Sequence, residues 1–253
     1  MTTAFTTPLR VPATAALLET WESALTAEPA RRGVLLLAPM CEECGDLGDR
    51  FPGELNRLLL RARVLLFGTV CDAVADCPGC DAQLEAAIPL AELTSAESAP
   101  TPVGEITVGD IHITYRLPTW RELTALTDQS VDAAAAQLLA HCVTSISSGE
   151  HDLTLDELDS EALCAVDEAI SDADPDALIE VQLSCPECGE TARLPMDPAS
   201  FLWDEVDRWA LSVLSEVAEL AAAFGWSQHN ILSMSPWRRR AYLTMAQPQR
   251  RPS

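Results

Sequence analysis

The 253-residue sequence has no lysine, so arginine alone accounts for its 16 Lys+Arg positions. Lysine chemistry, such as a Schiff base or the phosphate-holding lysine of a P-loop, is therefore excluded. Acidic residues number 39, which gives a formal net charge of −23. A chain this acidic repels a phosphate backbone on average, so we do not expect its surface as a whole to bind nucleic acid.

Long apolar runs and catalytic patterns are also missing. The longest apolar runs, at residues 33–40 and 133–140, are far below the ~18 consecutive apolar residues that a membrane span needs. The first residues lack the basic-then-apolar order of a signal peptide, so we expect a cytoplasmic location and no membrane. The four histidines are scattered, and there is no glycine-rich phosphate loop or nucleophile elbow. We therefore expect a protein that is not an enzyme.

Cysteine, by contrast, is plentiful. Nine cysteines in a reducing compartment favour metal binding or redox chemistry over a disulfide framework. Two segments match each other, because each has a short apolar strand, a Cys-Pro-x-Cys turn and a second short strand. One such turn supplies two thiolates, and two turns complete the tetrahedron that Zn²⁺ prefers. We predict a structural zinc ion held by Cys77, Cys80, Cys185 and Cys188.

The wide spacing of the two turns is compatible with one shared site. They are separated by 104 residues, positions 81–184. Closing a longer loop costs only about 0.6 kcal/mol per doubling of its length, whereas a structural zinc ion contributes on the order of 10 kcal/mol. A folded insertion between the two halves is therefore tolerable.

The other cysteines leave alternatives open. Cys41 and Cys44 form a third pair that competes for one half of the metal site, although no strand pattern flanks it. The turn at residues 77–80 also fits a thiol-disulfide oxidoreductase, provided that residues 81–87 form a helix whose N-terminus lowers the pKa of the first thiol. The remaining cysteines stand alone among apolar neighbours and are expected to be small buried side chains: Cys71, Cys142 and Cys164.

The spacing of apolar residues predicts an α+β fold that is mostly helical. Its β part is a small zinc-ribbon-like unit made by the two CPxC hairpins, with a helical insertion between them and a helical segment after them. The expected parts are an N-terminal helical segment (1–68), a first zinc-knuckle hairpin with a β segment (69–118), a helical acidic insertion (119–174), a second zinc-knuckle hairpin (175–197), a C-terminal helical segment (198–247) and a disordered tail (248–253).

The C-terminal segment has the clearest pattern. Residues 198–224 repeat apolar side chains at steps of three and four, which is typical of an amphipathic helix, and Gly225 is suited to end it. Aromatic residues and arginines follow, which is the composition of interface hot spots. We predict partner contacts from Trp226, Trp237, Arg238, Arg239 and Tyr242. Two alternatives remain: a local core beside a solvated arginine face, or a helix-turn-helix-like unit at residues 227–245 in a zinc-ribbon nucleic-acid-binding regulator.

Several short motifs resemble one known family. They are the CPECG knuckle, Phe201-Leu202-Trp203, Phe224-Gly225-Trp226-Ser227, Arg116-Leu117-Pro118-Thr119, and Ser235-Pro236-Trp237 followed by three arginines. Together they resemble the zinc-knuckle proteins encoded with phage-like contractile tails and extracellular contractile injection systems, which are similar to the T-even-type phage baseplate assembly proteins. The resemblance implies a non-enzymatic role in building a baseplate or forming part of it. It also implies baseplate or tail proteins as partners and incorporation into a phage-like particle.

Overall fold

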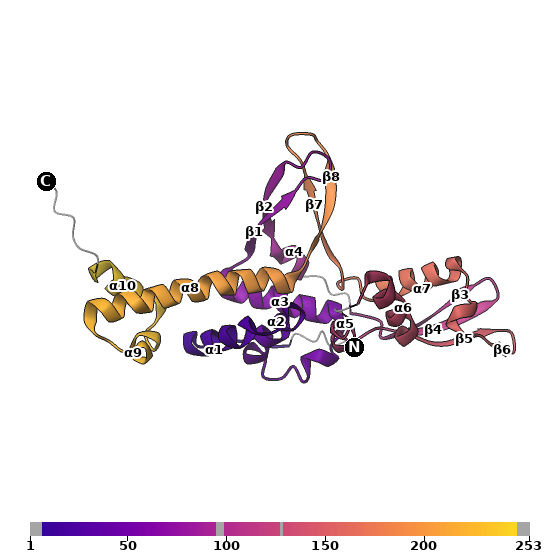
Figure 1. Cartoon of the computed structure of the whole chain (residues 1–253), viewed down its shortest axis with the longest axis horizontal. Helices are drawn as coiled ribbons and strands as arrows, with labels where there is room; N and C mark the ends of the chain where they lie inside the picture. Colours follow the sequence, from indigo (N-terminus) through magenta and orange to yellow (C-terminus); the bar gives the residue numbers. More distant parts are fainter. Residues whose placement is uncertain (1–6, 95–98, 127–128, 247–253) are drawn as a thin grey trace.

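The computed structural model describes residues 7–94, 99–126 and 129–246. Helices account for 53% of the described residues and strands for 20%, which confirms the expected α+β, mostly helical class. Figure 1 shows an elongated molecule with the long helix α8 (Pro198–Phe224) along its axis. The disordered tail expected at residues 248–253 lies outside the described residues.

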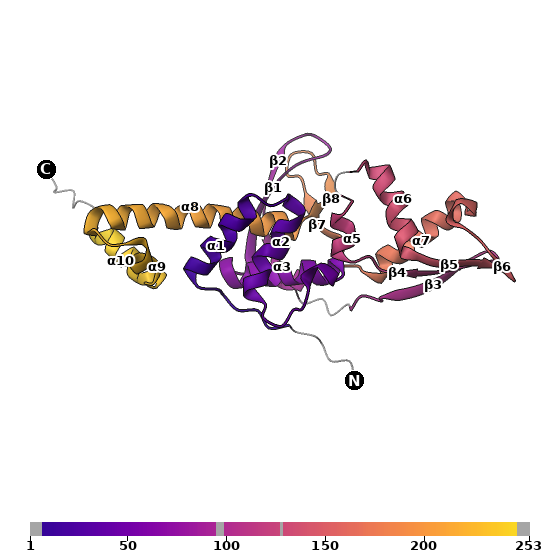
Figure 2. The same ribbon diagram turned by 60° about the horizontal axis from the view of Figure 1, so that its bottom comes forward.

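Four helices form what we call the helical layer: α1 (Thr14–Leu25), α2 (Pro29–Leu37), α3 (Pro52–Phe67) and the first half of α8. Figures 1 and 2 show the first three helices lying against that half of α8. Leucines from all four helices share one apolar cluster, in which Leu37, Leu59 and Leu202 have no exposed surface. This cluster is the main core of the protein, because apolar burial is the dominant stabilising term in folding.

Helix α8 follows the predicted pattern closely. Its N-cap residue, Asp197, accepts a hydrogen bond from the backbone N–H of Ala199. Its C-cap, Gly225, has a φ of 70°, the left-handed conformation that glycine adopts most easily. The buried stripe runs through Leu202, Val206, Val213, Val217 and Leu220, at helical spacing.

Polar contacts fix α8 to the rest of the helical layer. Arg63 on α3 donates two hydrogen bonds to the Glu205 carboxylate, at 2.6 and 2.7 Å, and a third to the carbonyl of Gly68. The indole N–H of Trp21 donates to Asp207 at 2.8 Å. Two donors to one carboxylate define direction as well as distance, so these contacts set the orientation of α8.

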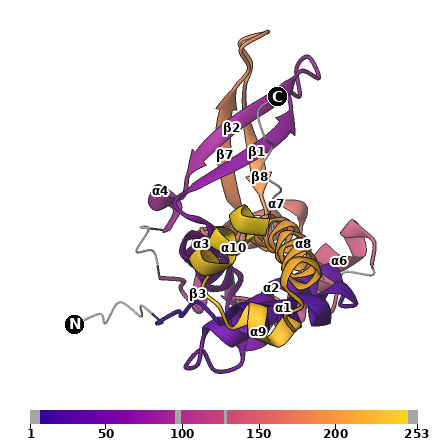
Figure 3. The same ribbon diagram turned by 90° about the vertical axis from the view of Figure 1, so that its left-hand side faces the viewer.

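Two β-hairpins rise from the helical layer as a unit that we call the knuckle tower. The first hairpin pairs β1 (Val70–Asp76) with β2 (Gln83–Pro89), and the second pairs β7 (Ile179–Ser184) with β8 (Thr191–Met196). Figures 1 and 3 show the hairpins side by side above α8. Their inward side chains alternate along each strand and meet in two small clusters.

The insertion between the hairpins is a separate layer that we call the distal sheet unit. Its antiparallel sheet has the order β3-β4-β5-β6, covered by α7 (Ser160–Ala173), and α6 (Val131–Cys142) leads into it. The β segment expected within residues 69–118 contains the hairpin of β3 (Val103–Val108) and β4 (Ile111–Arg116). The expectation that residues 119–174 are helical was incomplete, because this stretch also supplies two further strands: β5 (Val143–Ser148) and β6 (His151–Asp152).

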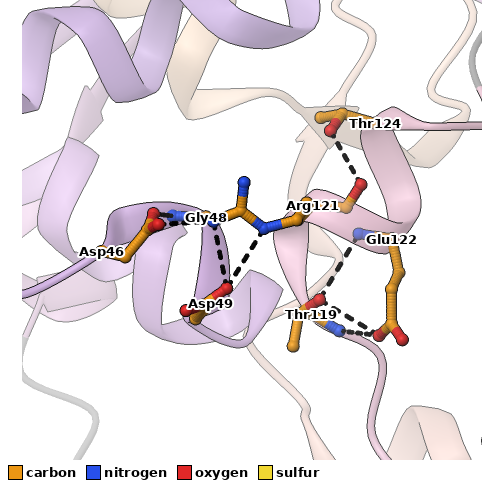
Figure 4. A network of polar contacts seen from close by, with 7 residues as sticks. All are labelled: Asp46, Gly48, Asp49, Thr119, Arg121, Glu122 and Thr124. Carbon is orange, nitrogen blue, oxygen red and sulfur yellow. Dashed lines mark hydrogen bonds and ion pairs between the residues drawn. The ribbon is translucent and has the colours of Figure 1, made fainter.

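A short helix, α5 (Trp120–Thr124), joins the distal sheet unit to the helical layer. Figure 4 shows Arg121 between the carboxylates of Asp46 and Asp49, while Glu122 turns back to Thr119. The guanidinium of Arg116 also donates two hydrogen bonds to Glu122, and this contact above all lowers the Glu122 pKa to about 2. Glu122 is therefore ionised at neutral pH and holds both a helix cap and an ion pair.

The end of α8 carries the C-terminal tip, made of α9 (Gln228–Leu232) and α10 (Pro236–Ala246). Its small core contains Leu220 and Ile231, neither of which is exposed. Aromatic rings close this core, with Trp226 stacked on Phe224 at 4.6 Å and edge-on to Tyr242 at 4.8 Å between centroids. Over the described part of the chain, no helix has the length and apolar character that crossing a membrane requires.

Candidate metal centre

The tips of the knuckle tower are two turns with the same pattern of backbone hydrogen bonds. In the first, the N–H of Cys77 donates to the carbonyl of Ala82, and the N–H of Asp81 donates to the carbonyl of Cys77, at 2.9 and 2.8 Å. In the second, Cys185 donates to Glu190 and Gly189 donates to Cys185, at 2.7 and 3.0 Å. The half-repeat in the sequence is therefore also a repeat in structure.

The two turns differ in the residue that adopts a positive φ. Gly189 has a φ of 76°, and its counterpart Asp81 has a φ of 58°, the only positive φ among the described non-glycine residues. Aspartate tolerates the left-handed conformation better than most residues that have a Cβ. Asp81 therefore completes the first turn at a position where glycine is the usual choice.

The four sulfur atoms predicted to meet lie within 4.8 Å of one another. The Cys77 and Cys188 sulfurs are 3.6 Å apart, and the Cys80 and Cys185 sulfurs are 3.7 Å apart. A tetrahedral Zn²⁺ site with a Zn–S distance of about 2.3 Å places its sulfurs about 3.8 Å apart. The cluster thus has the size and the donor chemistry of a tetrathiolate metal site.

The electrostatics of the cluster favour a bound cation. Backbone N–H groups of Cys188 and Glu187 donate to the Cys185 sulfur and lower its pKa to about 7. At Cys80 the N–H of Ala82 also lowers the pKa, but the neighbouring sulfurs outweigh it and raise the value to about 12. Four thiolates at this spacing repel one another, so a positive ion is needed for all four to be ionised together.

The ends of the insertion meet, which brings the distant turns together. Near its start, the N–H of Thr101 donates to the carbonyl of Ala173 at the end of its last helix, α7, at 2.8 Å. The next residue, Asp174, accepts a hydrogen bond from the N–H of Gly53 at the start of α3. A side chain at position 53 would collide with this carboxylate, so glycine is required there.

A second contact fixes the same loop just before β7. The Asn56 amide donates to the carbonyls of Asp176 and Ala177, at 2.9 and 3.0 Å. Gly53, Asn56 and Asp174 were not predicted as contributors to the site. Only Gly53, a glycine in the first turn of α3 where a cap is normally formed locally, was a usable signal.

The other cysteines lie outside the four-sulfur cluster. Cys41 and Cys44 are joined in a disulfide within the helical layer, so this pair does not take part in the cluster. Cys71 and Cys142 are buried, as expected, but Cys164 is exposed and that expectation was wrong. Cys164 lies on the outer side of α7, and its neighbours Ala162 and Val166 face the sheet instead.

The turn at residues 77–80 is followed by a strand and not by a helix. Strand β2 begins at Gln83 and pairs along its whole length with β1. The oxidoreductase interpretation needed a helix dipole at residues 81–87 to lower the pKa of the first thiol. The helix on which that interpretation depended is not formed.

The residues predicted to contact partners have different environments. Trp237 is 80% exposed and Arg238 is also exposed, whereas Trp226 and Tyr242 are half-buried in the aromatic core of the C-terminal tip. Arg239 corrects the prediction, because it is only 2% exposed. Its guanidinium pairs with Glu216 of α8 at 3.0 Å and donates to the carbonyl of Met234, so it holds the tip together from inside.

Comparison with known proteins assigns the family. A family model described as T4 bacteriophage base plate protein matches residues 37–203, about two thirds of the chain. The chain belongs to the T4 bacteriophage base plate protein family. No curated protein and no solved structure matches it. The matched range contains both cysteine turns and ends at the first turns of α8, so the motifs of the C-terminal tip lie beyond it.

Proposed function

We propose that this base plate family protein is a non-enzymatic assembly or structural component of a contractile tail or injection system. The observation that carries the proposal is the family match over residues 37–203. The elongated shape supports it, since the knuckle tower, the distal sheet unit and the C-terminal tip all project from the helical layer (Figure 1). Such projections offer several separate surfaces to neighbouring proteins during assembly in the cytoplasm.

We further propose that the four-sulfur cluster holds zinc as a structural ion. The sulfur spacing fits a tetrahedral site, and four protein ligands leave no coordination position for a substrate. Cys77 and Cys185 are buried, while Cys80 and Cys188 are at the surface, so the ion would sit just below the top of the tower. Its role would be to lock the two hairpins together.

The C-terminal tip is the proposed partner surface. Trp237 exposes a large apolar side chain beside the exposed Arg238, the combination enriched in interface hot spots. Removing either side chain leaves the core of the tip intact. Removing the Arg239 side chain leaves the Glu216 carboxylate without the guanidinium that it pairs with.

The test is co-purification with the baseplate and tail proteins encoded beside this chain. We expect Trp237→Ala to reduce capture at least tenfold with an unchanged melting temperature, and Arg239→Ala to lower the melting temperature. Leu211→Ala, which removes another exposed apolar side chain on α8, is the matched control and keeps full capture. Failure to capture any baseplate or tail protein refutes the proposal, and a salt-sensitive DNA mobility shift would favour the nucleic-acid-binding alternative.

A further inference from the structure

The knuckle tower has a groove that the metal centre does not use. It lies between β2 and β7, has a volume of about 230 Å³, and is lined by residues 83–86 together with Leu183, Ser184 and Pro186. Pockets for drug-sized molecules span roughly 300–1,000 Å³. The groove is therefore small for a metabolite and suited to a single large side chain.

The surroundings of the groove are strongly acidic. The two hairpins, residues 69–90 and 178–196, carry seven acidic residues and a single arginine. Glu85 lines the groove, and Glu187 lies exposed on the adjoining turn. The lining combines apolar side chains, Leu84, Ala86 and Leu183, with the Glu85 carboxylate, and this mixture fits an apolar side chain that arrives with a positive charge beside it.

The same chain carries such a side chain at its other end. Trp237 is 80% exposed on α10, and the neighbouring Arg238 and Arg240 are exposed. No acidic residue follows Glu219. The C-terminal tip is thus the basic, aromatic counterpart of the groove, in a protein whose overall charge is −23.

A tip cannot reach the groove of its own chain. The tower joins α8 at its start and the tip folds on its end, and a helix of 27 residues is about 40 Å long. We propose that the groove between β2 and β7 binds the Trp237 side chain of a second copy, with Arg238 against the Glu85 carboxylate. The inference rests on the proposed role of the C-terminal tip as a docking surface, and it names the groove of a second copy as the surface on which the tip docks.

The contact is head to tail, because tip and groove are different surfaces. Each copy offers one of each, so association continues into rings or open chains instead of stopping at a symmetric dimer. Charge pairs at the rim of an interface are screened by salt, so the association weakens as the salt concentration rises.

The test uses the full-length, metal-loaded chain in sedimentation velocity experiments. Wild type is expected to form oligomers at about 0.1 mM in low salt, the range of a weak specific contact. Trp237→Ala and Glu85→Arg are each expected to remain monomeric. Mixed in equal amounts, these two variants form a two-chain complex and nothing larger, because one supplies an intact groove and the other an intact tip.

Control variants separate this contact from other causes. Glu180→Arg, an exposed charge reversal on β7 outside the groove, and Leu211→Ala must associate like wild type. Metal content is measured on every variant, so that Glu85→Arg is interpreted only with its metal bound; if it loses metal, Glu85→Gln replaces it. A monomeric wild type, association that both variants leave unchanged, or a mixture that stays monomeric overturns the inference. A monomeric wild type that still captures baseplate proteins leaves the proposed function standing.

Discussion

The helical layer and the knuckle tower are built by the same chain but held together in different ways. The layer buries leucines from four helices in one continuous cluster. The top of the tower has only three buried core residues, Cys77, Leu84 and Cys185, and two of these are candidate metal ligands. Small units that cannot bury enough apolar surface need a metal or a disulfide. We therefore expect the tower to fold only together with its proposed metal ion, and the helical layer to fold without it.

Removing the proposed metal ion is the most direct test of this difference, and we expect it to have the largest effect on stability. A structural zinc ion contributes on the order of 10 kcal/mol, more than so small a core supplies alone. We expect chelation, or Cys77→Ser, to abolish amide protection in β1, β2, β7 and β8 while α2 and α8 keep theirs. Hydrogen exchange with mass spectrometry measures both regions in one experiment.

The matched control is Cys164→Ser, which changes an exposed cysteine outside the cluster. It should leave the exchange of every strand unchanged. Persistent protection of β7 after complete metal removal would show that the tower is stable by packing alone, and the contrast with the helical layer would fail.

Leucine truncations sharpen the same contrast at intermediate size. Leu202 of α8 has no exposed surface, and Leu→Ala at such sites costs about 2–5 kcal/mol. Leu183 of β7 is half-buried, so its truncation should cost about 1 kcal/mol in the metal-loaded protein. Urea unfolding monitored by circular dichroism gives the first value, and metal release during the titration gives the second. Equal costs at the two sites would contradict the proposed difference.

The amount of structure that the sequence predicted follows the same division. Helix α8 was predicted from its start to its end, because an apolar stripe and a capping glycine are local signals. The cysteine turns were also local, and their matching form indicated that they meet. Strand β5 was missed because its polar, serine-rich sequence lacks clear alternation and is stabilised by pairing with β4.

Contacts between distant residues account for the errors at single positions. Arg239 lies in a run of three arginines, and only the position of Glu216, 23 residues earlier, determines which of the three is buried. Asp174 likewise caps a helix that begins 122 residues before it, at Pro52. No local pattern encodes such partners. The composition of these surfaces could therefore be predicted from the sequence, but not which of their side chains stay exposed.

Lowering the pH should test the contacts of α5 separately from the knuckle tower. The Glu122 pKa is lowered from 4.5 to about 2, so the contribution of Glu122 to stability is complete above pH 4.5 and is lost as the pH falls toward 2. Glu122→Gln keeps an acceptor for the cap but loses the ion pair with Arg116, which should cost about 1 kcal/mol. The melting-temperature gap between this variant and wild type should therefore be constant from pH 7 to 5 and close below 4.5. A gap that closes at higher pH would assign the effect to metal release instead.

The smallest expected effect compares the two turns that carry the candidate metal ligands. Asp81 has a positive φ at the position that glycine occupies in the second turn, so Asp81→Gly should relieve backbone strain and raise stability by a few tenths of a kcal/mol. Gly189→Ala introduces strain and should cost about 1 kcal/mol, or about fivefold in metal affinity. Competition with a chromogenic chelator measures the affinity.

Gly109→Ala is the matched control, because Gly109 has a φ of 62° in the distal sheet unit and its strain should leave metal affinity unchanged. If Gly109→Ala weakens metal binding as much as Gly189→Ala does, the tower and the rest of the chain fold as a single cooperative unit.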